Sequence, residues 1–285
     1  MQYLLATITI ALALLIQAHA TAAPLEEFIE AELRASALPG VSYAIVSEDT
    51  ITARAHGVTD LRTGAPVTAD TPFAIGSISK SFTATAILQL VEAGRVELDA
   101  PMANYLDVFA DRPSGAITIR QLLSHTSGFS TRQGNDTPPA QGEDAGALSQ
   151  HVARMAQGSP AFPPGSRWDY SNANYMLLGA VIEAESGLKF ETYIDANILE
   201  PLKMTNSSVG NRDSGAAMAT GHTPWFGGKR AVRDGKASRA ILPAGGVVAS
   251  ANDLALYLEM LLNQRDDIIS AEHKALMLRP ASPQS

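Results

Sequence analysis

The chain of 285 residues contains no cysteine, so disulfide bonds, zinc–thiolate sites and cysteine nucleophiles are excluded. Charge is also sparse, at 18% of residues, and the net charge of −8 without a basic cluster argues against a nucleic-acid-binding protein. Neither a repeat period nor a regular aromatic array is visible. What remains is a composition that is 46% hydrophobic, which suits one large globular domain or two interleaved ones.

Charged side chains are missing from the N-terminus, where the first one is Glu26. The apolar run "YLLATITIALALLIQ" is followed by Ala18-His19-Ala20, a small-x-small pattern suited to signal peptidase. We predict a signal peptide over residues 1–20, and an exported protein, periplasmic or secreted, from residues 21–285. The run is short for a transmembrane span, but it lacks a preceding Lys or Arg, so an uncleaved anchor is the alternative. No second long apolar run exists, and no membrane span is expected in the mature chain.

The pattern beyond this run predicts a mixed α/β (α+β) protein. Residues 25–36 have a helical apolar face, and residues 41–46 and 51–56 read as two strands, rich in β-branched side chains, around a polar turn. From about 94 to 205 the chain reads as a subdomain of short helices, one of them with Thr118 as its N-cap. Further helices are predicted near 252–263 and 271–278. The stretch "STRQGNDTPPAQGEDAG" is predicted to be a polar surface loop.

A serine and a lysine stand three residues apart in "PFAIGSISKSF", which precedes a helical pattern that stops at Gly94. Residues at this spacing are neighbours on a helix, so the Ser77 hydroxyl and the Lys80 amine can meet. The alternative is an ordinary capped amphipathic helix with a solvated lysine, and the quartet by itself does not separate the two.

A second motif, "YSN", lies between the turn signal "FPPG" and the helical pattern "YMLLGAVIEAE". There Tyr170 and Asn172 can project into a cleft. The alternative is that Tyr170 packs its ring and Asn172 caps the following helix, and for Asn172 we rate capping at least as probable as catalysis.

Together these residues make chemical sense. A serine hydroxyl is a poor nucleophile until a neighbour takes its proton, and no His-Asp pair is placed by motif to do so. Lys80 and Tyr170 can: desolvation near a helix N-terminus depresses the pKa of a lysine, and a neighbouring ammonium favours the phenolate form of a tyrosine. Asn172 offers an amide to a substrate carbonyl and to the lysine, and the Ser77 N–H can serve as an oxyanion donor.

The two motifs, "SISK" and "YSN", resemble those of the penicillin-recognising serine hydrolases. The stretches "LLSHTSGF", "PGSRWDYSNANYMLLGAVIE", "ILEPLKMTNSSV" and "PAGGVVASANDLALYLEMLLN" extend the likeness over nearly all of residues 25–280. The Tyr-x-Asn form is similar to the class C β-lactamase group with its D-alanyl-D-alanine carboxypeptidase and esterase relatives. The resemblance implies a β-lactamase-like antiparallel sheet flanked by helices plus a helical subdomain. It also implies Ser77 as the acylated nucleophile, Lys80 and Tyr170 as the acid/base pair, and Asn172 as a substrate contact.

One expected motif is absent. The family has Lys-Thr-Gly or His-x-Gly on a strand near the C-terminus, and this sequence has neither in a suitable place. We therefore expect the domain of residues 21–285 to be truncated before this motif, with the C-terminal strands missing.

Two functions follow. The first is an exported serine hydrolase acting through an acyl-enzyme on a D-Ala-type peptide, a β-lactam or an ester. The second is a truncated or degenerate relative that at most binds cell-wall peptides or β-lactams.

A metal-dependent hydrolase is disfavoured, because the histidines show no paired spacing with carboxylates and read as surface or packing residues: His56, His125, His151, His222 and His273. No cofactor or metal is expected, and the partner is a small-molecule or peptide substrate. The sequence carries no indication of the oligomeric state.

Overall fold

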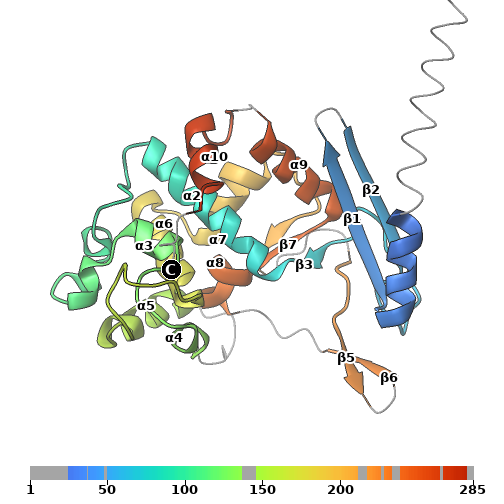
Figure 1. Ribbon diagram of the computed structural model, residues 1–285, viewed down its shortest axis with the longest axis horizontal. Coiled ribbons are helices and arrows are strands. Elements are labelled where there is room, and N and C mark those ends of the chain that lie inside the picture. Colours follow the sequence, from blue (N-terminus) through green and yellow to red (C-terminus); the bar gives the residue numbers. More distant parts are fainter. Residues whose placement is uncertain are drawn as a thin grey trace, which may run out of the picture.

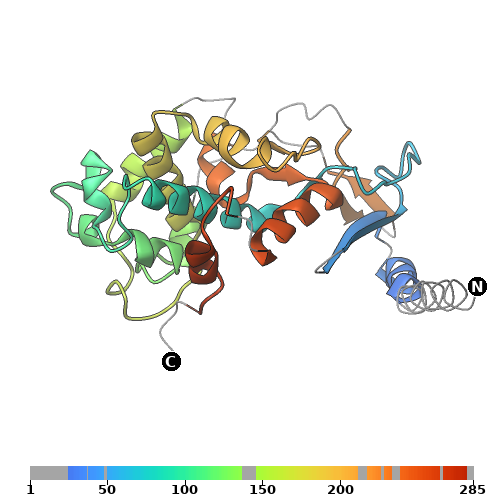
Figure 2. The same ribbon diagram turned by 90° about the horizontal axis from the view of Figure 1, so that it is seen from above.

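The computed structural model describes residues 25–36, 38–47, 50–136, 146–210, 217–225, 228–232, 238–263 and 266–280. The predicted signal peptide lies outside these residues. Figures 1 and 2 show an elongated molecule with a helical body at one end and the β1–β2 pair at the other. Helix α9 (Ala251–Leu262) packs between the helical body and β1. Among the described residues no helix is long and apolar enough to cross a membrane.

The two predicted N-terminal strands are confirmed as β1 (Gly40–Ser47) and β2 (Thr50–Gly57), paired antiparallel from Gly40↔Gly57 to Ser47↔Thr50. Alternating β-branched residues favour the extended backbone here. Residues 25–36 are helical, as predicted. This helix is tied to β2 by an ion pair of 3.0 Å between Arg54 and Glu26.

The strands of the described residues form three small antiparallel sheets. β1 and β2 form the first, and the second has the order β3–β7–β4, with β3 at Phe73–Ala74, β7 at Val247–Ala249 and β4 at Ser208–Val209. The hairpin of β5 (His222–Trp225) and β6 (Gly228–Ala231) is the third. In the part of the chain described, β1 pairs with β2 alone, so its other edge has unpaired backbone groups.

Helix α2 (Ser79–Glu92) runs through the middle of the helical body. Its side chains Phe82, Ala86 and Ile87 have no solvent exposure, and burying one large apolar side chain contributes about 1.5–3 kcal/mol. Besides α2 and α9, the described chain has the following α-helices: α3 (Ile119–Leu123), α4 (Thr131–Asn135), α5 (Ala147–Gln157), α6 (Asn172–Ser186), α7 (Phe190–Ile194), α8 (Leu242–Gly245) and α10 (Ala271–Met277).

The prediction of a polar surface loop from residue 130 onward was wrong for the first part of that stretch. Residues Thr131–Asn135 form α4, which begins with a capping box: the Ser130 hydroxyl accepts from the Gln133 N–H and the Gln133 side chain returns to the Ser130 N–H. This reciprocal pair satisfies two backbone donors and stabilises even a single turn. The sequence Ser-x-x-Gln carries this signal. The same device starts α3, where Thr118 is the N-cap as predicted.

The segment around α8 is fixed to α2 by hydrogen bonds along its length. Thr83 Oγ1 donates to the Pro243 carbonyl at 2.7 Å, and the Val247 N–H donates to Ser79 Oγ at 2.9 Å. Close packing against α6 requires Gly179, since a methyl group there would lie 2.2 Å from Pro243 Cγ. Residues 243–247 are thereby held against the start of α2.

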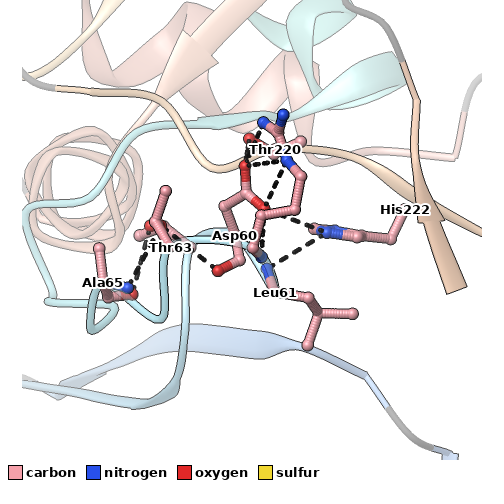
Figure 3. A network of polar contacts seen from close by, with 8 residues as sticks. Asp60, Leu61, Thr63, Ala65, Thr220 and His222 are labelled. Carbon is pink, nitrogen blue, oxygen red and sulfur yellow. Dashed lines mark hydrogen bonds and ion pairs between the residues drawn. The ribbon is translucent and has the colours of Figure 1, made fainter.

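A polar network joins the chain after β2 to the segment before β5 (Figure 3). The Asp60 carboxylate accepts a hydrogen bond of 2.6 Å from Arg62, and Thr220 Oγ1 approaches the same oxygen at 3.4 Å. The Arg62 guanidinium holds the pKa of Asp60 well below its ordinary value, at about 2. His222 lies beside them, with its Nε2 3.4 Å from the Leu61 N–H. This network anchors the β5–β6 hairpin, which projects from the body in Figure 1.

Candidate active site

Ser77 lies at the exposed N-terminal end of the α2 region. It occupies a 3₁₀ turn, Gly76–Ile78, directly before the α-helix rather than the first α-helical turn. The turn begins with Gly76 at φ +52°, a left-handed conformation that glycine adopts without strain. Lys80 is 6% exposed, and its Nζ donates to Ser77 Oγ at 3.2 Å. The predicted contact between the hydroxyl and the amine is therefore present in the structure.

Tyr170 and Asn172 reach the same point from the start of α6. The Tyr170 hydroxyl lies 2.6 Å from Ser77 Oγ, and Asn172 Oδ1 accepts from Lys80 Nζ at 2.9 Å. All four predicted site residues are thus brought together across more than 90 residues of sequence. The capping alternative for Asn172 was wrong, because Ser171 occupies the N-cap and Asn172 is the first residue of the helix.

The Lys80 ammonium group donates to three acceptors. Besides Ser77 Oγ and Asn172 Oδ1, its Nζ contacts the Ala244 carbonyl oxygen at 2.6 Å. Burial lowers the pKa of Lys80 from its ordinary value, while the Tyr170 hydroxyl opposes that shift. The Nζ also lies 4.8 Å from the centre of the Tyr170 ring, within cation–π range. Each N–H of the Lys80 ammonium is directed at an oxygen. The group is therefore suited to carry its positive charge here and to fix the positions of the three acceptors.

The proton of Ser77 then has one near acceptor. Because Lys80 donates to Ser77 Oγ, the serine hydroxyl hydrogen is free to point to the Tyr170 oxygen at 2.6 Å. That separation is typical of a strong O–H···O hydrogen bond. The arrangement can therefore transfer a proton from Ser77 to Tyr170 while Lys80 stabilises the resulting negative charge on the serine oxygen.

Helix α4, which the sequence reading missed, braces the Tyr-x-Asn loop. The Thr131 hydroxyl donates to the Tyr170 carbonyl oxygen, and Asn135 Oδ1 accepts from Asn172 Nδ2 at 3.1 Å. Gly134 permits this approach, since a methyl group there would lie 2.6 Å from the backbone nitrogen of Asn172. The Asn172 amide is thus oriented at both ends, with its oxygen toward Lys80 and its nitrogen toward α4.

A groove of about 420 Å³ runs along the unpaired edge of β1. It lies between β1, β3, β7 and α9, and Ile75, two residues before Ser77, forms part of its wall. The lining is almost wholly apolar and includes Tyr43, Phe73 and Leu258. The expected third motif would belong on a strand near the C-terminus, and none of the described strands carries it.

The histidines and carboxylates of the described chain make no group of three or more that could hold a metal ion. Of the five histidines discussed above, His125 contacts the site, with its ring 4.7 Å from that of Tyr170. The sequence reading had assigned it to the surface or to packing. The chemistry available to the assembled residues is therefore nucleophilic attack by a serine oxygen with help from a phenol and an ammonium.

Known proteins resemble this chain in sequence. The Beta-lactamase family profile matches residues 25–284. Esterase EstB of Burkholderia gladioli is 33% identical over 204 residues, covering 66% of this chain and 52% of that protein. Penicillin-binding protein 4 of Amycolatopsis lactamdurans is 32% identical over 173 residues, covering 60% of this chain and 44% of that protein. The chain thus spans about half the length of these curated relatives.

A solved structure gives the same result for the fold. The octameric penicillin-binding protein homologue from Pyrococcus abyssi superposes with a TM-score of 0.75 and 29% identity, over 89% of this chain and 59% of the other. The mixed α/β architecture expected from the sequence is therefore confirmed as β-lactamase-like. By the match along nearly its whole described length, the chain belongs to the Beta-lactamase family of serine hydrolases and penicillin-binding proteins.

Proposed function

We propose that this chain is an exported serine hydrolase that acts through an acyl-enzyme on an amide or ester carbonyl. The observation that carries the proposal is the contact of 2.6 Å between Ser77 Oγ and the Tyr170 hydroxyl, beside Lys80 at 3.2 Å. At these distances a proton can pass from the Ser77 hydroxyl to the Tyr170 oxygen as the serine attacks the substrate. Export is proposed from the apolar run and small-x-small pattern of residues 1–20.

In the first step Tyr170 acts as a phenolate and takes the Ser77 proton, becoming a neutral phenol, as the serine oxygen bonds to the substrate carbonyl carbon. The Ser77 N–H stabilises the oxyanion, and the Lys80 ammonium lies 4.8 Å from the centre of the Tyr170 ring. Collapse of the tetrahedral intermediate breaks the bond to the amine or alcohol, which leaves with the proton that Tyr170 returns. A water molecule then attacks the ester on Ser77, and Tyr170 carries its proton to the serine oxygen, which restores the free enzyme.

Among substrates, we favour a D-Ala-type peptide or a short ester over a dedicated β-lactamase role. An esterase and a penicillin-binding protein are among the relatives that match this chain, and large branches of the resembling group are not resistance enzymes. The Asn172 amide, held by Lys80 and Asn135, is the side chain we assign to contact the substrate.

The competing function is a truncated or degenerate relative that at most binds cell-wall peptides or β-lactams. It draws support from the absence of the third motif and from the unpaired edge of β1 in the described chain. A binding protein of this kind would hold a penicillin reversibly, without a covalent bond to Ser77.

Intact-mass analysis after exposure to a fluorophosphonate and, separately, to a penicillin tests the proposal. We expect one adduct, located on the peptide that contains Ser77 and abolished in Ser77→Ala. Ser81→Ala is the matched control, since this serine lies one turn further along α2 and its hydroxyl donates to the Ile78 carbonyl at 2.7 Å. Labelling that persists in Ser77→Ala, or an unlabelled wild type, contradicts the proposed function.

A further inference from the structure

His125 is the residue that holds the backbone on both sides of Tyr170. Its Nδ1 accepts a hydrogen bond of 3.1 Å from the Ser171 N–H. Its carbonyl oxygen accepts one of 3.0 Å from the Asp169 N–H. The Trp168–Asp169 and Tyr170–Ser171 peptide groups are therefore tied to one residue that lies more than 40 positions earlier in the chain.

The His125 ring also sets where the Tyr170 ring can lie. The two ring centres are 4.7 Å apart, and the Tyr175 ring lies 5.2 Å from His125 on the α6 side. Trp168 meets the imidazole edge-on at 6.2 Å. Aromatic pairs at such separations contribute about 0.5–1.5 kcal/mol beyond the burial of their area, so they favour this position of the Tyr170 ring.

A neighbouring amide determines which form of the imidazole fits. Ser127 Oγ donates to Asn174 Oδ1 at 2.6 Å, which leaves Asn174 Nδ2 as the group that faces His125 Nδ1 at 3.1 Å. Nδ1 thus faces two N–H donors and must carry a lone pair. Burial, together with the positive charge of Lys80, lowers the pKa of His125 to about 4, so the ring is neutral at ordinary pH.

The backbone of His125 is unusual as well. Its φ is +58°, a left-handed conformation that few residues other than glycine adopt. Asparagine, aspartate and histidine tolerate this region better than other side chains do. The position therefore combines a strained backbone, an acceptor nitrogen and a ring in contact with the general base, a set of features that packing alone does not require.

We propose that His125 is a positioning residue for Tyr170, and that it acts mainly through Nδ1 as a hydrogen-bond acceptor. This rests on the proposed function, in which Tyr170 takes the Ser77 proton. Without the acceptor, the Ser171 N–H loses its partner and the Tyr170–Ser171 peptide can rotate, which moves the phenol away from Ser77. A displacement of about 1 Å at a reacting group slows a reaction by about 10²-fold.

Two substitutions separate the acceptor from the ring. His125→Asn keeps an acceptor near the position of Nδ1 and tolerates the left-handed backbone, while His125→Phe keeps the ring and loses the acceptor. The rate of Ser77 labelling by a fluorophosphonate is measured for each, at a temperature where circular dichroism shows both to be folded. We expect His125→Phe to react about 10²-fold more slowly than wild type, and His125→Asn to retain most of the rate. Equal rates in wild type and His125→Phe, or a faster His125→Phe than His125→Asn, overturn the proposal.

A second measurement distinguishes positioning from general damage to the fold. In a Tyr170→Phe background the general base is already absent, so His125→Phe should cause little further loss of labelling rate. An equal fold loss in both backgrounds would mean that His125 acts on the structure as a whole, and the proposal fails. His151→Asn is the matched control, because His151 is also a buried histidine, 2% exposed, and lies in α5. If wild type itself is not labelled, the proposed function fails instead, and the two failures are therefore distinguishable.

Discussion

The helical body and the β1–β2 pair differ in how completely they are packed. In the helical body, α2 and α6 bury nearly every apolar side chain, and Met176 and Leu177 have no exposure. In the strand pair no residue is fully buried, and Ile45 and Ile51 are 44% and 38% exposed. The residues of the proposed chemistry all lie on the packed side, whereas the groove along β1 lies on the open side. The acylating group can therefore be well ordered although one wall of the substrate site is not formed by the described residues.

The largest expected effect falls on the packed side. Tyr170→Phe and Lys80→Met should each slow labelling of Ser77 by about 10² to 10⁴, the usual contribution of general-base help. The two losses should be strongly non-additive, because both side chains contact Ser77 Oγ and act on the same proton transfer. Stopped-flow or timed mass spectrometry with a fluorophosphonate measures both single variants and the double variant. Wild-type labelling in Tyr170→Phe would make the tyrosine structural and leave Lys80 as the candidate base.

The second-largest effect is expected on the open side, where one edge of β1 is unpaired. No described strand carries the third motif, so we expect the site of these residues to lack a second oxyanion donor, and such a donor contributes about 10² to 10³ in rate. Residues 21–285 should then label at Ser77, hydrolyse a nitrophenyl ester slowly and associate through the open edge of β1. A longer polypeptide that adds strands beside β1 should recover both turnover and solubility.

One substitution tests the open edge separately from the chemistry. Ile45→Lys places a charge on β1, which should reduce light scattering while leaving the labelling rate unchanged. A monomeric, cooperatively folding 21–285 protein with efficient ester hydrolysis would contradict this prediction, and would mean that another segment or a partner chain supplies the second oxyanion donor.

A smaller effect is expected where α4 meets the start of α6. Gly134→Ala would place a methyl group 2.6 Å from the backbone nitrogen of Asn172 and 2.7 Å from Ser171 Oγ, so either α4 or the start of α6 must move. We expect a loss of about 1–3 kcal/mol in the free energy of unfolding, measured with urea. Gly158→Ala is the control, because its new methyl group would meet only the Met155 carbonyl oxygen, at 3.6 Å. Equal stability of the two variants would mean that α4 is not packed against the Tyr-x-Asn loop.

The smallest expected effect is a change of stability with pH. Burial lowers the pKa of both His125 and His151 to about 4, below the value near 6.5 expected in the unfolded chain. Each group therefore contributes stability that is fully present above about pH 6.5 and is lost as the pH falls through about 4. Between these values the Tm should fall less steeply in His125→Asn and in His151→Asn than in wild type. Unchanged slopes would show that neither imidazole is held neutral by the fold.

Local patterns predicted those parts of the fold that depend on neighbours in sequence. The β1–β2 hairpin, the helix of α2 and the N-cap at Thr118 follow from residues a few positions apart. The capping box of α4 is equally local, and it was missed because turn-forming residues follow it. The pairing of β3, β7 and β4 joins strands that are distant in sequence, and such pairing depends on how the segments pack.

The sequence by itself determined the pairing of Ser77 with Lys80, because a spacing of three residues fixes their proximity in any helical turn. Tyr170 and Asn172 were candidates from their chemistry and from the resemblance, since nothing local links residues more than 90 positions apart. The Ala244 carbonyl and the His125 imidazole were assigned to the site by the tertiary structure alone. Every residue has a backbone carbonyl, so no residue type marks Ala244 as a ligand of Lys80, and a histidine shows its partners only when the chain around it has folded.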